Sequence, residues 1–534
     1  MTDTAAPLLP SYRSGTSDRP LLGELIGQVL RRTAATYPER EALVDVPSGR
    51  RWTWQQLDHD VDRLATGLLG LGLAAGQRVA VWATNCPEWV LLQYATARVG
   101  LVLVTVNPAY RVHELAFVLA QSGAALLVSA ERHRSSDYRA MVAQVAAPAT
   151  VFLGSSQWSA LLVDPDAAAL DARAATLSFD DPINIQYTSG TTGSPKGATL
   201  SHHSIVNNGF FVGELCGYDE TDRVCVPVPF YHCFGMVMGN LGALTHGACV
   251  VIPAPSFDPA ATLAAVESER CTSLYGVPTM FIAELGLPDV GAYDLRSLRT
   301  GIMAGSPCPA EVMERVVGEL GMTDVTICYG MTETSPVSTQ TRADDDLRRR
   351  VTTVGRVHPH LEVKVVDPGT GLVVPEGTTG ELCTRGYSVM LGYWQEPERT
   401  AEAVDGTGWM HTGDLAVMDA DGYLQVVGRI KDLVIRGGEN IYPREVEDFL
   451  HRHPDVEDVQ VVGVPDPRYG EELLAAVRLR PGSDLTEEGL REHCRGAIAH
   501  YKVPRHVRFV TDFPMTVTGK IKKFEIRDQW VSER

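Results

Sequence analysis

The stretch from Tyr187 to Gly197 combines residue types that suit the binding of a polyphosphate. It reads Tyr-Thr-Ser-Gly-Thr-Thr-Gly-Ser-Pro-Lys-Gly and follows the apolar run 183–187. Its glycines let the backbone turn sharply and approach a ligand without interference from a Cβ atom. Hydroxyl and amide groups can hydrogen-bond phosphate oxygens, and Lys196 adds a mobile positive charge. A flexible surface loop would explain the glycines, but not this ordered series of hydroxyls, glycines and lysine.

The stretch is not a Walker A loop. That loop requires G-x-x-x-x-G-K-[ST], whereas here Pro195 precedes the lysine and Gly197 follows it. The sequence therefore predicts a phosphate loop of another kind.

Later segments also place chemically capable side chains after predicted strands or turns. They are Gly305-Ser306-Pro307, Cys328-Tyr329-Gly330-Met331-Thr332-Glu333, His411-Thr412-Gly413-Asp414, Gly428-Arg429-Ile430-Lys431-Asp432 and Pro514-Met515-Thr516-Val517-Thr518-Gly519-Lys520. Glu333 offers a hard oxygen ligand suited to Mg²⁺, which retains waters and bridges to substrate phosphates. Taken singly, a Thr-Glu pair is typical of a helix cap, the aspartate of a β-turn, and the last lysine of a solvated surface.

The first stretch resembles the phosphate loop of the adenylate-forming superfamily, which comprises acyl-CoA synthetases, nonribosomal adenylation domains and beetle luciferases. The later motifs match the same family in the same order, and the resemblance covers nearly the whole chain from about Leu21. It implies the following ATP-binding residues: Thr188, Ser189, Gly190, Thr191, Thr192, Gly193, Ser194, Pro195, Lys196, Gly305, Ser306, Pro307, Tyr329, Gly330, Thr332, Asp414, Arg429 and Lys520.

The resemblance also implies a role for each nucleotide-binding motif. Tyr329 stacks on adenine, and Thr332 hydrogen-bonds a phosphate. Asp414 accepts both ribose hydroxyls, and Arg429 contacts ribose or phosphate. Glu333 is the implied ligand of Mg²⁺.

Lys520 is the implied catalytic cation, acting together with Thr332, Glu333 and His232. In the family a lysine at this spacing swings into the active site and stabilises charge on the α-phosphate and the attacking carboxylate oxygen. One fixed cation in a water-poor site can lower a barrier by roughly 3–4 kcal/mol. Lys431 occupies the family's hinge position. Gly437 and Gly438 border the tunnel for the pantetheine arm of coenzyme A.

The segment around His232 is implied to contact the acyl group. The expected acyl pocket consists of His232, Phe234, Met236, Met303, Gly305 and Met331. Relatives that activate amino acids carry an aspartate here to hold the α-ammonium, and this segment has none. Methionine and glycine supply adaptable apolar surface suited to an alkyl chain. A lone histidine and scattered methionines are also typical of ordinary core packing.

Hydrophobic periodicity predicts the elements that carry these motifs. Helices are expected over 21–37, 56–71, 87–99 and 111–121, and strands over 42–45, 51–54, 78–82, 101–106 and 125–129. After the phosphate loop, which leads into a helix from residue 201, strands are expected over 223–227, 248–252, 273–277, 300–304 and 324–328, and helices over 260–270 and 310–319. This alternation predicts two subdomains of parallel strands with crossover helices. Ligands of such sheets bind beyond the carboxyl ends of the strands.

Beyond residue 351 the alternation of helices and strands gives way to short strand-like runs separated by glycine and proline. Strands over 361–366 and 380–385 and a hairpin at 419–422 indicate a small β-rich unit, and the charged loop 342–350 is expected to be a solvated surface turn. A compact α+β tail follows, with helices over 445–453 and 490–499 and strands over 458–464 and 473–479. The predicted fold class is therefore α/β. We expect residues 1–430 to form an N-terminal AMP-binding (adenylation) domain and residues 431–534 a mobile C-terminal domain that carries Lys520.

Composition limits the classes of function. The chain has 534 residues, a net charge of −19 and a pI of about 5.3, which argues against a nucleic-acid partner. Its ten cysteines include no C-x-x-C pair, so they are expected to be reduced core residues. Neither a secretory signal nor an apolar run of the roughly 18 residues that span a bilayer is found. A cytoplasmic location is expected, and the oligomeric state stays open, with a homodimer as one option.

Within this superfamily, the residue patterns of the sequence most resemble those of medium-chain fatty-acyl-CoA synthetases. We therefore expect an acid–thiol ligase that uses ATP, Mg²⁺ and coenzyme A to activate a fatty acid. One alternative is a stand-alone adenylating enzyme that passes the acyl group to a carrier protein or an amine. A luciferase-like oxidase would share every motif. A non-catalytic nucleotide-binding scaffold would be expected to have lost Lys520, Glu333 or Arg429, and all of them are present.

Overall fold

The computed structural model of this chain describes residues 9–188, 195–437, 439–515 and 521–533. They form two compact units, each built from separate stretches of sequence. The larger unit comprises residues 13–363 and 384–411, and the smaller comprises the chain up to Tyr12, residues 364–383 and everything from Thr412 onward. The changes of unit fall inside strands, namely β1 (Tyr12–Ser14), β19 (Leu361–Val366), β20 (Gly380–Gly386) and β22 (Met410–Met418).

The larger unit contains a seven-stranded sheet in the order β21-β11-β10-β5-β4-β6-β9. Strands β10, β5, β4, β6 and β9 run parallel, as the alternation of predicted helices and strands requires. Strands β11 and β21 add an antiparallel edge. The bounds are β4 Arg78–Trp82, β5 Val102–Thr105, β6 Leu126–Ser129, β9 Ala149–Phe152, β10 Pro182–Thr188, β11 Lys196–Ser201 and β21 Gly392–Tyr393.

A nine-stranded sheet has the order β18-β17-β16-β15-β14-β12-β13-β2-β3. Its strands from β16 to β2 are parallel, so the second series of predicted strands is confirmed. The early strands β2 and β3 join this sheet rather than the first one. The bounds are β2 Glu41–Asp45, β3 Arg50–Thr53, β12 Arg223–Cys225, β13 Cys249–Ile252, β14 Ser273–Gly276, β15 Thr300–Ala304, β16 Asp324–Gly330, β17 Val337–Gln340 and β18 Arg356–Val357.

Alternation along the strands divides the apolar side chains between opposite faces of each sheet. In β4, Val79 and Val81 pack in a core that combines residues of both sheets, whereas Ala80 and Trp82 pack in a core on the other face. In β15, Ile302 belongs to the shared core and Met303 to a separate one. Because successive side chains of a strand point to opposite faces, both faces of each sheet need apolar cover.

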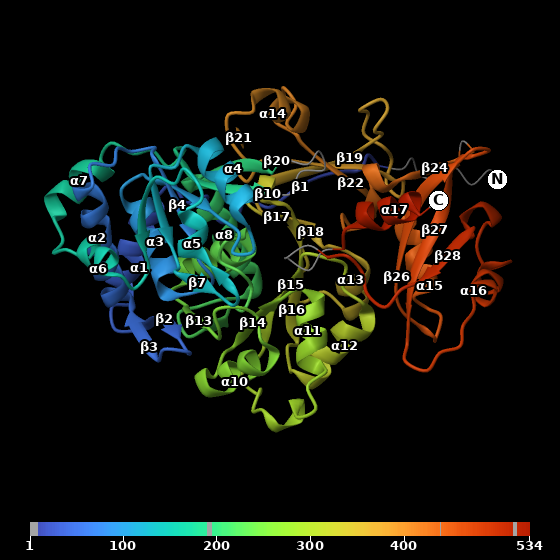
Figure 1. The fold of residues 1–534 in the computed structure, drawn as a ribbon, viewed down its shortest axis with the longest axis horizontal. Helices are drawn as coiled ribbons and strands as arrows, with labels where there is room; N and C mark the ends of the chain where they lie inside the picture. The colour runs from blue at the N-terminus through green and yellow to red at the C-terminus, as the bar shows by residue number, and fades with distance from the viewer. Residues whose placement is uncertain (1–8, 189–194, 438, 516–520, 534) are drawn as a thin grey trace. The chain divides into compact units, whose positions relative to one another are not determined.

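Helices supply that cover. The shared core takes residues from α1 (Ile26–Thr36), α2 (Trp54–Gly70), α3 (Pro87–Arg98) and α8 (His202–Cys216). On the outer face of the first sheet lie α4 (Val112–Ser122) and α5 (Tyr138–Val142). On the outer face of the second lie α10 (Pro259–Glu269), α11 (Pro278–Leu285) and α12 (Ala310–Glu319), grouped together in Figure 1. The remaining α- and π-helices of this unit are α6 Ser156–Leu161, α7 Ala167–Ala174, the π-helix η1 Phe234–Leu241, α9 Gly242–His246, α13 Leu347–Thr352 and α14 Pro397–Ala403.

The smaller unit carries the hairpin of β22 and β23 (Leu424–Arg429) and a sheet in the order β25-β24-β27-β26, with β28 beside β27. The bounds are β24 Val434–Arg436, β25 Glu439–Ile441, β26 Val456–Asp466, β27 Gly470–Leu479 and β28 His506–Phe509. Its helices are α15 Pro443–Leu450, α16 Glu487–Cys494 and α17 Lys523–Ser532, orange to red in Figure 1. The compact α+β tail is confirmed, although β24, β25, β28 and α17 were not predicted.

The prediction that the charged segment 342–350 is a solvated surface turn is only partly right, because residues 343 and 344 form an exposed turn but a helix with a buried arginine follows. Helix α13 begins at Leu347 with Asp346 as its cap, and Arg350 is buried. The guanidinium of Arg350 donates to the carbonyl oxygen of Asp345 at 2.8 Å. Backbone carbonyl groups thus provide the hydrogen bonds that the buried guanidinium needs, so the run of charge does not form a solvated turn over its whole length.

The prediction that the cysteines are core residues is confirmed for eight of the ten, because all but Cys86 and Cys308 are buried. Within the described ranges, every helix is too short or too polar to cross a lipid bilayer.

Candidate active site

The phosphate loop joins two antiparallel strands. Strands β10 and β11 pair with Thr188 opposite Lys196, so the loop between them closes a hairpin. The six predicted phosphate contacts from Ser189 to Ser194 lie outside the described residues. Lys196 is the first residue of β11 and is half-buried. The hairpin therefore fixes where Lys196 enters the sheet.

The predicted helix after the loop is confirmed, but strand β11 precedes it. Helix α8 begins at His202, and the Ser201 hydroxyl accepts a hydrogen bond from the Ser204 amide at 3.0 Å. A serine at this position satisfies an amide group that the first helical turn leaves unpaired.

Thr332 and Glu333 lie in a short 3₁₀ turn directly after β16. Both residues are 6% exposed. The turn is tight, because a Cβ atom at Gly330 would lie 1.8 Å from the carbonyl oxygen of Pro336, so only glycine fits there. The Thr332 hydroxyl is 3.8 Å from the thiol of Cys233. The structure thus brings Thr332 to the segment that carries His232.

The structure reveals Tyr393 as a site residue that the sequence reasoning missed. Its hydroxyl donates to Glu333 Oε1 at 2.8 Å, and the Lys196 ammonium lies 4.7 Å from the centre of its ring. Burial raises the pKa of the Tyr393 phenol, and the Glu333 carboxylate raises it further. The phenol therefore remains a hydrogen-bond donor at neutral pH. It joins the lysine of the phosphate loop to the carboxylate predicted to bind Mg²⁺.

Two more predicted nucleotide contacts lie at neighbouring strand ends. Strands β15 and β16 pair in parallel with Ala304 beside Cys328, so Gly305 and Tyr329 follow at the same edge of the sheet. Gly305, Ser306 and Pro307 are exposed, and Tyr329 is half-buried. Gly305 has a φ of +93°, a conformation that favours glycine. This edge is where an open α/β sheet binds its ligands.

The predicted acyl-pocket residues fall into two groups. Phe234 and Met236 are buried in η1 and belong to the shared core, against which Met331 packs. The Phe234 ring stacks on Tyr275 with 5.6 Å between centroids, and half-buried His232 accepts the Phe234 amide at Nδ1 over 3.2 Å. Met303 packs in the core on the opposite face of its sheet. The structure therefore does not bring Met303 together with Phe234 and Met236.

In the smaller unit, Asp414 and Arg429 are opposite residues of the β22–β23 hairpin. Arg429 Nε donates to Asp414 Oδ1 at 2.9 Å, and the side chains are 61% and 11% exposed, respectively. Asp414 is part of strand β22 rather than of a β-turn. Its amide donates to the Thr412 hydroxyl at 3.1 Å. The two predicted nucleotide contacts are therefore held side by side.

The other predicted residues of this unit lie near the next strands. Lys431 is exposed in a 3₁₀ turn, Ile430–Asp432, between β23 and β24. Gly437 has a φ of +58°, and its amide donates to the carbonyl oxygen of Tyr469 at 2.8 Å. Gly438 and Lys520 lie outside the described residues.

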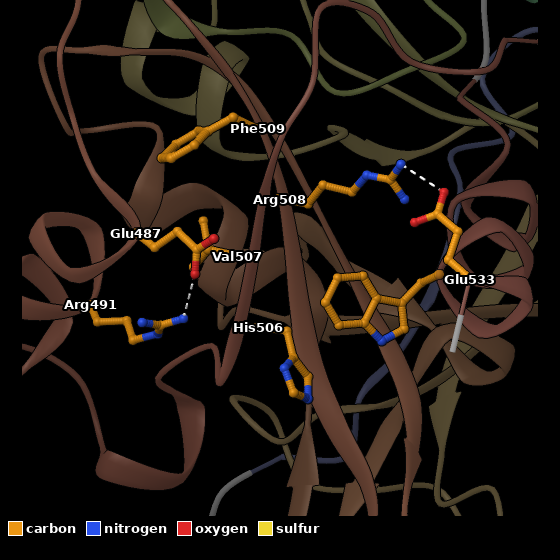
Figure 2. A pocket seen from close by; sticks show the side chains of 8 residues that line it. Glu487, Arg491, His506, Val507, Arg508, Phe509 and Glu533 are labelled. Atoms are coloured by element: carbon orange, nitrogen blue, oxygen red, sulfur yellow. Dashed lines mark hydrogen bonds and ion pairs between the residues drawn. The ribbon is translucent and has the colours of Figure 1, made fainter.

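A pocket in the smaller unit contains none of the predicted residues. It is lined by residues of α16, β28 and the C-terminal end: Glu487, Arg491, His506, Val507, Arg508, Phe509, Trp530 and Glu533. Figure 2 shows that its arginines pair with its carboxylates, Arg491 with Glu487 at 2.9 Å and Arg508 with Glu533 at 2.9 Å. Since these cations are already neutralised, the pocket is poorly suited to a polyphosphate.

Family models match both parts of the chain. The model described as AMP-binding enzyme matches residues 30–394, and the model described as AMP-binding enzyme C-terminal domain matches residues 445–520. The first match alone covers more than half of the sequence.

Curated relatives and solved structures are similar over nearly the full length. YngI of Bacillus subtilis (strain 168), a candidate acyl-CoA synthetase by its name, is 48% identical over 96% of this chain and 98% of its own. The mitochondrial medium-chain acyl-CoA ligase ACSF2 of Danio rerio is 46% identical over 98% of this chain and 91% of its own. The crystal structure of ATP-bound MatB from Rhodopseudomonas palustris superimposes with a TM-score of 0.81 at 30% identity, covering 94% of this chain and 99% of MatB.

Proposed function

This chain belongs to the AMP-binding enzyme family, and we propose that it is an AMP-forming acyl-CoA synthetase acting on medium-chain fatty acids. The observation that supports the proposal is that half-buried Lys196 lies against the ring of buried Tyr393, whose hydroxyl donates to buried Glu333. It sets a cation for phosphate and a hard oxygen ligand next to the hairpin, within a chain that is similar throughout to acyl-CoA ligases.

The proposed reaction has two steps. A carboxylate oxygen of the fatty acid attacks the α-phosphorus of ATP, the bond to the β-phosphate oxygen breaks, and acyl-adenylate and pyrophosphate form. The thiol of coenzyme A, losing its proton, then attacks the acyl carbon, and AMP leaves with the oxygen that had bridged it to the acyl group. Acyl-CoA and AMP are the products.

The residues of the larger unit act on phosphate and adenine. Lys196 and the hydroxyl-rich loop hold the phosphates, Thr332 donates to a phosphate oxygen, and Tyr329 stacks on adenine at the edge of the sheet. Half-buried His232 lies one residue from Cys233, whose thiol is close to Thr332. We propose that His232 orients the carboxylate of the fatty acid and that Phe234, Met236 and Met331 lie along its alkyl chain.

The donor set fits a magnesium ion. Glu333 is buried, and one of its oxygens accepts a hydrogen bond from the Tyr393 phenol, so the carboxylate is held in one orientation. Mg²⁺ prefers one or two carboxylates together with substrate phosphates, and Glu333 would hold it. When bound, the ion neutralises charge on the phosphates.

The residues of the smaller unit are proposed to serve ribose and the chemical step. Asp414 accepts the ribose hydroxyls, and Arg429 orients Asp414 and contacts the nucleotide. Lys520 stabilises charge on the α-phosphate during the first step. Lys431 is the proposed hinge between the poses that the two steps require, and the loop at Gly437 and Gly438 serves coenzyme A in the second step.

A series of straight-chain fatty acids tests the substrate class. We expect kcat/KM to rise with each added methylene group, because burying one such group contributes up to about 0.8 kcal/mol of binding free energy. Once the pocket is full, kcat/KM should fall. The assay is pyrophosphate release with and without coenzyme A, with α-amino acids as the comparison set. Turnover of free α-amino acids above that of every fatty acid would contradict the proposal.

A further inference from the structure

We propose that Tyr393 is a positioning residue that holds Glu333 through its hydroxyl and Lys196 through the face of its ring. The inference rests on the proposed function, because it concerns the carboxylate assigned to Mg²⁺ and the lysine assigned to phosphate. It adds a residue to which the sequence analysis had assigned no role.

Backbone hydrogen bonds fix Tyr393 against the phosphate-loop hairpin. Strand β21 pairs with β11 so that Tyr393 lies opposite Ala198. The Trp394 amide donates to the carbonyl oxygen of Gly197 at 2.7 Å, and the Leu391 amide donates to that of Thr199 at 2.9 Å. These bonds flank Tyr393 on both sides, so its backbone is fixed at the edge of the sheet.

The same segment is also tied to the turn that carries Glu333. The Met390 amide donates to the carbonyl oxygen of Glu333 at 2.9 Å, and the Tyr393 hydroxyl donates to its Oε1 at 2.8 Å. Both the backbone and the side chain of Glu333 are therefore set by residues 390–393. Tyr393 and Glu333 are 7% and 6% exposed, respectively, which strengthens the bond between them.

Tyr393 also keeps the Lys196 ammonium and the Glu333 carboxylate apart, so that each can bind a ligand. In the part of the chain that the structure describes, Lys196 contacts the ring of Tyr393 and forms no ion pair with Glu333. A direct ion pair would turn both groups toward each other and away from ligands. A ring face attracts an ammonium ion and a hydroxyl satisfies a carboxylate oxygen. The ammonium is thus left for phosphate and the carboxylate for a cation.

Two substitutions separate the halves of this role. Tyr393→Phe removes only the hydroxyl, and Tyr393→Leu removes the ring as well. The measurement is calorimetric titration of the full chain with α,β-methylene-ATP, in EDTA and in Mg²⁺, without fatty acid so that no turnover occurs. We expect Tyr393→Phe to lower the gain in affinity due to Mg²⁺ by about tenfold, as for other partners of metal ligands, and to leave affinity in EDTA unchanged. Tyr393→Leu should also lose about three- to tenfold in EDTA.

Matched variants make the outcomes distinct. Tyr387→Phe is the control, because it removes a buried tyrosine hydroxyl of the same segment that interacts with Asn208 rather than with Glu333; it should match the wild type. Glu333→Gln should abolish the gain in affinity due to Mg²⁺, and adding Tyr393→Phe to it should change nothing further.

A normal Mg²⁺ gain in Tyr393→Phe, with the gain lost in Glu333→Gln, would overturn this inference and leave the proposed function standing. A normal gain in Glu333→Gln would overturn the metal role itself. Melting temperatures within a few degrees of wild type confirm folding, and Tyr393→Phe decides the question if Tyr393→Leu does not fold.

Discussion

Replacing Lys520 by alanine is expected to lower the rate of acyl-adenylate formation on the order of 10²- to 10³-fold, as does the removal of one preorganised donor in other enzymes. The reason is that the five-coordinate α-phosphorus of the first step carries extra negative charge on its oxygens, which the Lys520 ammonium is proposed to stabilise while the carboxylate attacks. Thioester formation from added acyl-adenylate and coenzyme A should stay close to the wild-type rate, because that step does not need this cation. Single-turnover assays of each half-reaction measure the two rates separately.

Lys522→Ala is the matched control for this variant. Lys522 lies two residues away, and its ammonium is 2.7 Å from the Glu525 carboxylate, so it is already paired. Its loss should leave both half-reactions intact, since an exposed ion pair contributes little to stability. An equal collapse of both half-reactions in a folded Lys520→Ala variant would refute the role given to Lys520.

Replacing Asp414 by alanine is expected to weaken ATP binding by about 1–3 kcal/mol, which is roughly 5- to 150-fold in Kd, because both ribose hydroxyls lose a charged acceptor. The fold should survive. The Arg429 side chain is 61% exposed, so water can replace the partner that it loses. Asp414→Asn should fall between alanine and the wild type, since the amide oxygen still accepts one hydroxyl. Titration calorimetry with ATP and with 2′,3′-dideoxy-ATP measures the effect.

The dideoxy nucleotide separates a ribose contact from a general loss of structure. The wild type should lose affinity for it, whereas Asp414→Ala should bind both nucleotides alike. Asp421→Ala, in the exposed turn of the same hairpin, should behave like the wild type. Unchanged ATP affinity in Asp414→Ala would reduce Asp414 to a structural partner of Arg429.

Local sequence patterns were enough to predict most of the parallel strands. Residues 78–82 and 300–304 are strands with the predicted bounds, because buried parallel strands need uninterrupted apolar residues and glycine or proline marks the turns. The fold class and the motif edge at Gly305 and Tyr329 follow from the same patterns. The first helix begins at Ile26 rather than at residue 21, since apolar spacing alone does not mark the helix start.

What the sequence could not supply are contacts between segments that are far apart. Tyr393 is 60 residues from Glu333, and the pairing of the two-residue strand β21 with β11, together with the Met390 amide bond to Glu333, brings them together. Strand β11 itself was overlooked because glycine and hydroxyl residues dominate the loop before it. Met303 was assigned to the acyl pocket by residue type, but strand alternation directs it to the opposite face from Ile302. Predicting its face required the sheet as well as the residue.

The account depends most on the acyl-adenylate, and oxygen labelling tests that intermediate directly. A medium-chain fatty acid carrying ¹⁸O in both carboxylate oxygens is incubated with the enzyme, ATP, Mg²⁺ and coenzyme A, and the products are weighed by mass spectrometry. The predicted result is acyl-CoA that keeps one ¹⁸O, AMP that gains one ¹⁸O, and unlabelled pyrophosphate. Label in inorganic phosphate with release of ADP, or AMP without ¹⁸O beside newly formed acyl-CoA, would contradict it.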